Sequence, residues 1–250
     1  ASSVDIDELI KIIKDKNIGI LIPCRFKQME FIIEHYDKIK RRVKMIICSD
    51  CYDTIESFEN KIKFRDFMIK NKFQNLIPTT YKFNNLLTTK KIEPIIYPCI
   101  FKLAKTYSGD GSKICNNKQE VLDCENLYKL RQSFVQEFIH ETTEYAAHMF
   151  INNGKIKWAI CYKMIHPTDL FIQKGKMNEY EKVKFDFKVF SKIFEVIKYT
   201  GFVCIDFKII GNNNSNNIKI FEINPRLGGT LVNNLNDFTD VIKYIGKYAT

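Results

Sequence analysis

The chain lacks a hydrophobic run long enough to cross a membrane, and it lacks the pattern of a secretory signal. Its longest apolar runs, residues 18–23 and 43–48, have the length of single strands, whereas a membrane-spanning helix needs about 20 apolar residues. The opening sequence ASSVDIDELI is acidic where a secretory signal has a basic segment followed by an apolar one. We therefore expect a cytoplasmic protein without a membrane partner.

The sequence also lacks the cysteine spacing of disulfide-bonded or zinc-binding proteins. Its eight cysteines are scattered, mostly within apolar segments, which is typical of reduced core residues. Cys48 and Cys51 form a single CxxC motif, without a second pair or a Cys/His partner at the spacing of zinc sites. This pattern disfavours a metal or redox role for the motif.

Basic charge is abundant but is not concentrated in any segment. The net charge is +10, which would attract nucleic acid or another polyanion. The lysines are spread along the whole chain, however, and form no basic stripe. We expect no nucleic-acid partner, and dispersed lysines also suit a site for nucleotide phosphates.

The order of the expected helices and strands predicts an α/β (α+β) protein of three parts. Residues 1–75 alternate between helix and strand patterns, which predicts a small parallel sheet. A turn-rich segment around Pro78 suggests a boundary, after which residues 76–140 form a second α/β lobe. The first part has expected helices at 5–14, 28–40 and 61–70 and strands at 18–23 and 43–48; the second has strands at 97–103 and 133–139, a polar loop at 105–113 and a helix at 120–130.

Residues 141–250 change to longer strand patterns. Two of them flank the turn Asn152-Asn153-Gly154, whose residue types are typical of an antiparallel hairpin. The third part is therefore predicted to contain an antiparallel sheet. Its expected elements are hairpin strands at 144–151 and 155–166, a helix at 178–199 and strands at 202–210 and 218–223.

Three oxygen donors are predicted to meet on one face of the last two strands. Side chains alternate across a strand, so Glu222 and Asn224 project from one face while Phe221 and Ile223 project from the other. On the preceding strand, Asp206 points away from its apolar neighbours and is expected to meet Glu222 across the hairpin. Two carboxylates and an amide suit Mg²⁺. The alternative is that both acids are exposed sheet residues paired with lysines.

The segment FEINPR, which ends at Arg226 and follows a strand of the form GxxxxDF, resembles the C-terminal signature of the ATP-grasp superfamily. The likeness is closest to the branch with carbamoyl-phosphate synthetase and biotin carboxylase. The resemblance implies two α/β lobes that hold ATP between them, preceded by a short N-terminal parallel α/β lobe. It also implies that Asp206, Glu222 and Asn224 bind the magnesium ions of MgATP, or manganese in their place, and that Arg226 contacts the phosphoryl or acyl-phosphate group.

Other segments follow in the order of the same family. Lys102 is similar to the family's phosphate-contacting lysine, to which we assign a catalytic role with Arg226. Lys61 is similar to a basic residue ahead of the first lobe that reaches the phosphates. Small residues let backbone N–H groups approach phosphate oxygens, although an ordinary surface turn has the same composition. The phosphate-covering loop implied by the resemblance contains Ser108, Gly109, Gly111 and Ser112.

The resemblance assigns the base and the sugar of ATP to a third group of residues. Residues 135–139 resemble the interlobe segment on which adenine lies. Glu144 is at the place of the ribose-binding acid, and His166 is at that of a nucleotide-contacting histidine, although a lone histidine there is more often structural. The residues implied to lie at the base edge are Glu137, Phe138 and Ile139.

As a whole, the resemblance implies an ATP- and magnesium-dependent carboxylate–amine ligase. Such an enzyme phosphorylates a small-molecule carboxylate to an acyl phosphate, which an amine or other nucleophile then attacks. The N-terminal lobe lacks the usual opening strand, and Asn60 and Asp110 depart from the family pattern. A second hypothesis is therefore an MgATP-binding module, or a ligase fragment that needs a missing lobe or a partner. A homodimer or a partner subunit is compatible with both.

Overall fold

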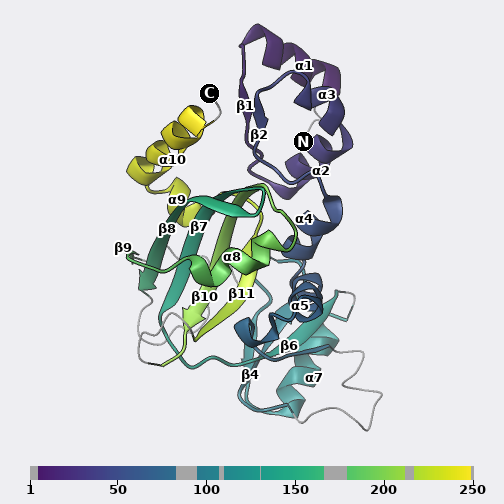
Figure 1. Ribbon diagram of the computed structural model, residues 1–250. Helices are drawn as coiled ribbons and strands as arrows, with labels where there is room; N and C mark the ends of the chain where they lie inside the picture. Colours follow the sequence, from purple (N-terminus) through teal and green to yellow (C-terminus); the bar gives the residue numbers. More distant parts are fainter. Residues whose placement is uncertain are drawn as a thin grey trace.

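The computed structural model describes residues 5–82, 95–106, 110–129, 131–165, 179–211 and 217–248. Within these residues the chain forms three sheets (Figure 1): a two-stranded parallel sheet near the N-terminus, a four-stranded antiparallel sheet and a five-stranded antiparallel sheet. The five-stranded sheet lies between the other two in the view of Figure 1. The mixed α/β architecture with a small parallel N-terminal sheet is confirmed, while the domain boundaries at residues 75 and 140 stay a prediction.

The N-terminal lobe is built around a very short parallel pair. Strands β1 and β2 pair in parallel, as the helix–strand alternation predicts. Asp5 caps the first helix, its side chain accepting from the backbone N–H of Asp7 at 3.2 Å. The single helix expected at 28–40 is interrupted at His35. The elements are α1 (Ile6–Asp15), β1 (Ile20–Leu21), α2 (Phe26–Glu34), α3 (Tyr36–Lys40) and β2 (Met45–Ile46).

Two consecutive helices link this lobe to the five-stranded sheet. They are α4 (Tyr52–Glu59), which the sequence did not predict, and α5 (Lys61–Lys70), which has the predicted bounds. Asn60 separates them. Its side chain is buried, 3% exposed, and its Oδ1 accepts from the backbone N–H groups of Ile62 at 2.9 Å and Lys63 at 3.2 Å. This cap makes Lys61 the first residue of α5, and both helices pack against the last strand of the sheet.

The four-stranded sheet forms a small lobe with one helix. Its strands run in the order β3-β6-β4-β5, all antiparallel. A compact core of Cys99, Phe101, Leu103, Cys115 and Cys124 lies between the sheet and the helix. Strands β3 and β5 were not predicted. The elements are β3 (Thr80–Lys82), β4 (Cys99–Leu103), β5 (Lys113–Cys115), α7 (Lys118–Leu127) and β6 (Ser133–Glu137).

The five-stranded sheet confirms the predicted antiparallel hairpins. Its order is β11-β10-β7-β8-β9, and every pair is antiparallel. The turn between β7 and β8 places Asn153 and Gly154 at φ 47° and 76°, the left-handed region that these residue types tolerate. The strands are β7 (Glu144–Asn152), β8 (Lys155–Ile165), β9 (Glu179–Val183), β10 (Gly201–Ile209) and β11 (Ile218–Asn224).

The helix expected over residues 178–199 is wrong in its first part. Residues Glu179–Val183 instead form strand β9, which pairs with the edge of β8, and the helix α8 spans only Lys188–Glu195. The apolar pattern at helical spacing is real in α8, where Phe190, Ile193 and Phe194 are fully buried. The unpaired edge of a strand offers backbone hydrogen bonds to another segment, and the local sequence of that segment does not show that this edge is near.

The two faces of the sheet are covered differently. On one face, α8 and residues from α4 and α5 pack against Val203, Ile205 and Phe207 of β10. On the other face, α9 (Gly229–Val232) and α10 (Leu235–Tyr248) pack against Phe150 and Phe202. Part of this second face stays uncovered and borders a cavity. No helix within the described ranges is both long and apolar enough to cross a membrane.

The segment after β11 approaches the sheet very closely at Gly228. A Cβ atom built there would lie 2.5 Å from His148 Cε1 and 2.6 Å from Cys204 Sγ. At Gly229 a Cβ would meet nothing within 4 Å. The absence of a side chain at Gly228 therefore fixes how near this segment comes to β7 and β10.

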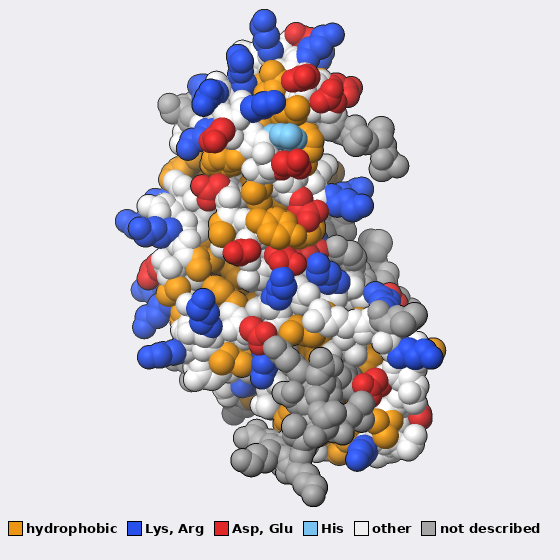
Figure 2. Space-filling view, turned by 90° about the vertical axis from the view of Figure 1, so that its right-hand side faces the viewer, with side chains coloured by type: hydrophobic (Ala, Val, Ile, Leu, Met, Phe, Trp, Pro, Cys, Tyr) orange, Lys and Arg blue, Asp and Glu red, His pale blue; other side chains and the backbone are white. Residues whose placement is uncertain are grey.

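All eight cysteines are free, in agreement with the expected reduced state. Cys24 and Cys51 are exposed, however, and are not core residues. On the face shown in Figure 2, Lys and Arg side chains are spread over the length of the molecule and alternate with acidic ones. This distribution on that face agrees with the dispersed lysines of the sequence.

Replacement of the cap residue by Asn60→Ala is expected to lower the free energy of unfolding by about 1–2 kcal/mol, because two helix N–H groups lose their acceptor in a buried place. Asn60→Asp keeps the acceptor and should lose less. Urea unfolding measures both variants, and an Asn60→Asp protein as unstable as Asn60→Ala would contradict the capping role.

Gly228→Ala is expected to lower the free energy of unfolding by about 1–3 kcal/mol, because the added methyl group overlaps His148 and Cys204. The matched variant is Gly229→Ala, which should change it by less than about 0.5 kcal/mol because the methyl group meets open space. Equal losses in thermal or urea unfolding would show that close packing at Gly228 is not the cause.

Candidate active site

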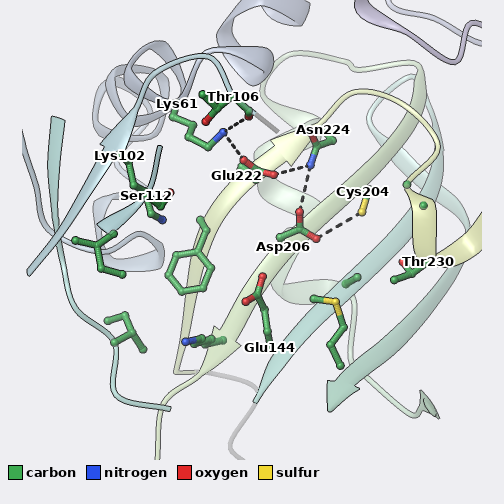
Figure 3. Close-up of a pocket in the computed structure, with 18 of the residues that line it drawn as sticks. Lys61, Lys102, Thr106, Ser112, Glu144, Cys204, Asp206, Glu222, Asn224 and Thr230 are labelled. Carbon is green, nitrogen blue, oxygen red and sulfur yellow. Dashed lines mark hydrogen bonds and ion pairs between the residues drawn. The ribbon is translucent and has the colours of Figure 1, made fainter. Parts of the chain in front are cut away.

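A cavity of about 290 Å³ lies between the four-stranded and five-stranded sheets (Figure 3). Side chains from α5, β4, β7, β10, β11 and the segment after β11 line it. Of the residues predicted for the site, the cavity is lined by Lys61, Lys102, Ser112, Ile139, Glu144, Asp206, Glu222, Asn224 and Arg226. Residues far apart in the sequence therefore meet in one place.

The predicted register of the last hairpin is confirmed. Asp206 on β10 lies directly opposite Glu222 on β11. The Asn224 Nδ2 group bridges the two carboxylates, donating to Asp206 Oδ2 at 3.2 Å and to Glu222 Oε1 at 3.1 Å. Figure 3 shows the three side chains converging on the cavity. The oxygen donors therefore share a face, while their role as metal ligands stays a prediction.

Phe221 was expected on the opposite face from Glu222, and this expectation is wrong. The pairing shifts between Asp206 and Phe207, so that Glu222 pairs with the first and Ile220 with the second. Phe221 is the extra residue of this bulge and lines the cavity together with Glu222. A bulge re-aims one side chain without changing the strands on either side, and the sequence alternation alone gives no sign of it.

Lys61 joins the small lobe to the carboxylate pair. Its Nζ lies 2.7 Å from Glu222 Oε2 and donates to the backbone carbonyl of Thr106 at 3.0 Å. The position follows from the Asn60 cap, which starts α5 at Lys61. One ammonium group thus contacts both the acidic strand and the segment that follows β4 (Figure 3).

The two carboxyl groups have opposite pKa shifts. Burial raises the pKa of Asp206 well above its usual range, and the charges of Glu222 and Glu144 raise it further. Burial also acts to raise the pKa of Glu222, but the ion pair with Lys61 and the hydrogen bonds that Glu222 accepts outweigh it and lower this pKa to about 2. Burial and the neighbouring carboxylates therefore favour the neutral form of Asp206, while Lys61 favours the ionised form of Glu222.

Lys102 is a half-buried cation on β4. Its Nζ donates to Gln136 Oε1 at 2.9 Å and lies 4.8 Å from the centroid of the Phe221 ring. Burial lowers its pKa to about 8, and the charge of Lys61 acts in the same direction. Gln136 is held in turn by Thr80, since its Nε2 donates to Thr80 Oγ1 at 3.1 Å.

Several predicted residues do not line the cavity. The Glu137 carboxylate accepts from the backbone N–H of Thr79 at 2.9 Å, and Glu137 is not among the residues that line the cavity. Phe138 and Gly111 are also outside the lining, and Gly111 adopts φ 68° against Leu103. Ser108, Gly109 and His166 lie outside the described residues.

The structure adds cavity residues that the sequence reasoning missed. Cys204 and Lys208 alternate with the apolar positions of β10 and share the face of Asp206, so the strand period was a sufficient signal for both. Thr230 lines the cavity and lies 2.6 Å from His148 Nε2. Burial lowers the pKa of His148 to about 3, so this imidazole is neutral. The cavity is also lined by residues that the sequence reasoning did not name: Ile100, Thr106, Ala146 and Met164.

The donor set fits a magnesium ion better than a metal held by protein ligands alone. Within the described ranges, no group of three or more His, Cys, Asp or Glu side chains is suitable for a metal. Asp206 and Glu222, with the Asn224 amide turned to present its oxygen, provide a few hard oxygen ligands. Mg²⁺ keeps its other positions for water and phosphate oxygens, for which the cavity has space.

Comparisons with known proteins find solved structures with a similar fold. N5-carboxyaminoimidazole ribonucleotide synthetase from Thermotoga maritima is similar with a TM-score of 0.59 and 16% identity, over 94% of this chain and 58% of that chain. Biotin carboxylase from Campylobacter jejuni, in a β-γ-ATP complex, has a TM-score of 0.56 and 14% identity, over 90% and 52%. D-alanine–D-alanine ligase from Bacillus anthracis, complexed with ATP, has a TM-score of 0.53 and 13% identity, over 88% and 72%.

At these identities the likeness shows the fold. The chain spans about half the length of several such proteins, for example 43% of an L-amino acid ligase from Bacillus licheniformis and 52% of a carboxyaminoimidazole ribonucleotide synthase. A search of curated proteins finds no match. A family model described as an ATP-grasp domain matches residues 58–230, the segment that contains the whole cavity. The chain therefore belongs to the ATP-grasp family.

Proposed function

We propose that this chain is the catalytic unit of an ATP- and magnesium-dependent ligase. It phosphorylates a small-molecule carboxylate to an acyl phosphate and joins the acyl group to an amine or another nucleophile. One observation carries the proposal: a pair of half-buried carboxylates, Asp206 and Glu222, lies in a cavity between two sheets and is held by Asn224 and Lys61.

The residues around this pair divide the work of phosphoryl transfer. Asp206, Glu222 and Asn224 would hold magnesium, which supplies charge neutralisation for the phosphate oxygens. Lys61 is fixed between Glu222 and the Thr106 carbonyl, so its ammonium group is already oriented before a phosphate arrives. Such preorganised charge stabilises the transferring group without reorganisation. No side-chain nucleophile is required by this chemistry.

Arg226 is the proposed contact for the phosphoryl or acyl-phosphate group. It follows β11 directly, lines the cavity, and its Nη2 donates to Asn224 Oδ1 at 3.2 Å. A guanidinium group presents a planar fork that matches a carboxylate or a phosphate. Lys102 lies on β4 of the small lobe and supplies a second cation to the same cavity.

Glu222→Ala is expected to reduce ADP release by at least about 100-fold, because it removes a carboxylate ligand and leaves Lys61 without its partner. The measurement is ADP release from MgATP in the presence of candidate carboxylate and amine pairs. The matched control is Glu181→Ala, since Glu181 is an exposed acid of the same sheet that pairs with Lys163 at 3.8 Å. Full turnover by Glu222→Ala would contradict the metal assignment.

A second candidate is an MgATP-binding module without independent ligase activity. It is supported by the fact that the chain spans about half the length of several relatives. Calorimetry separates the two proposals. MgATP binding without ADP release from any substrate pair, followed by activity when a longer chain or a partner is added, favours the module. Turnover by the chain alone excludes it.

A further inference from the structure

Strand β10 presents a row of three side chains to the cavity. Cys204, Asp206 and Lys208 all line it, and alternate residues of a strand are separated by roughly 6.5 Å. Cys204 lies at one end, next to Gly228. Asp206 lies in the middle, opposite Glu222. Lys208 therefore lies beyond the carboxylate pair, on the far side from the Gly228 segment.

Lys208 is a buried cation with an unusual environment. It is only 3% exposed, and its Nζ lies 5.7 Å from the centroid of the Phe221 ring. Lys61 and Lys102 both have hydrogen-bond acceptors in this cavity. In the described part of the chain, the ammonium group of Lys208 makes neither a hydrogen bond nor an ion pair. The charges of Glu144 and Glu141 act on Lys208 without a direct contact and partly offset its burial, but its buried N–H groups still lack an acceptor, which a ligand in the cavity can supply.

The surroundings of Lys208 suit a nucleoside better than a phosphate. The Phe221 ring is close to the ammonium groups of both Lys102 and Lys208, which come from different lobes. Its ring and the aliphatic stem of Lys208 provide flat apolar surface for a base. The groups suited to phosphates and magnesium are instead Lys61 and the Asp206–Glu222 pair. Asp206 lies two residues before Lys208 on β10.

We infer that Lys208 binds the nucleoside part of the nucleotide, donating a hydrogen bond to an acceptor atom of the base or the sugar. This inference rests on the proposed nucleotide site and names a specificity-determining residue within it. An ammonium group only donates, so Lys208 selects ligands that present a ring nitrogen, a carbonyl or a hydroxyl oxygen at this place. Lys208 is thus distinct in its target from Lys61, which faces the phosphate end.

The test compares MgATP with magnesium tripolyphosphate, which has no nucleoside, by calorimetry on the full chain. Lys208→Met keeps the length and the apolar stem but removes the donor. It should weaken MgATP binding by about 10-fold, the effect typical of one lost hydrogen bond from a charged group, and leave tripolyphosphate binding unchanged. Lys208→Arg should stay within about 3-fold of the unmodified chain for both ligands.

The matched control is Lys157→Met. Lys157 makes the same kind of contact outside the cavity, with its Nζ 5.7 Å from the centroid of the Tyr248 ring. It should bind both ligands like the unmodified chain. Without ligand, Lys208→Met should unfold at nearly the same temperature, because the lost attraction to Glu144 and Glu141 is offset by the removal of a buried charge that has no hydrogen-bond acceptor. Weaker MgATP binding without lower stability is a result that a structural role for Lys208 does not produce.

Two results overturn the inference while leaving the nucleotide site intact. MgATP binding by Lys208→Met that equals or exceeds that of the unmodified chain shows that Lys208 does not contact the nucleotide. An equal loss for MgATP and tripolyphosphate shows that it contacts the phosphates. If the unmodified chain itself does not bind MgATP, the proposed nucleotide site fails, and the role of Lys208 fails with it.

Discussion

The arrangement of the molecule depends on placing two acidic side chains directly opposite each other on neighbouring strands. Like charges at such a position destabilise a sheet, and burial increases the penalty. Two contacts compensate this pair: the Asn224 amide of β11 bridges the carboxyl groups, and Lys61 of α5 forms an ion pair with Glu222. The magnesium ion of the proposed function would offset the repulsion of the carboxylates further.

Lys61 can serve this pair only because the chain before it is built in a particular way. Helix α5 begins at Lys61 because Asn60 caps it. The helix packs against β11, and its residues Phe64 and Met68 belong to the core under the five-stranded sheet. The N-terminal segment therefore contributes to the cavity. It places Lys61 beside Glu222 of β11, and the hydrogen bond from Lys61 to the Thr106 carbonyl links the same side chain to the small lobe. Lys61 of α5 therefore contacts both the five-stranded sheet, through Glu222, and the small lobe, through Thr106.

The sequence predicted most of the third part and of the acidic pair, because a strand period of two fixes which side chains share a face. The register of β10 with β11 and the β7–β8 hairpin followed from that period and from turn chemistry. The sequence prediction failed where contacts between distant segments determine the local structure. Strand β9 forms because β8 offers a free edge, β3 and β5 are too short to show a pattern, and the bulge at Phe221 moves one side chain to the other face. The alternation that places Asp206 on the cavity face also places Lys208 there. In a chain with many lysines, the residue type alone did not mark Lys208 as a site residue.

Local charge says more about the ligand than the net charge of the chain. Among the described residues, four cationic side chains line the cavity, Lys61, Lys102, Lys208 and Arg226, against the three carboxyl groups of Glu144, Asp206 and Glu222. A polyanion accompanied by a divalent cation would satisfy both sets at once, since the cation would bind the carboxylates and the anion would contact the basic side chains. This balance of charge supports the proposal that the ligand of this cavity is a metal-bound nucleotide.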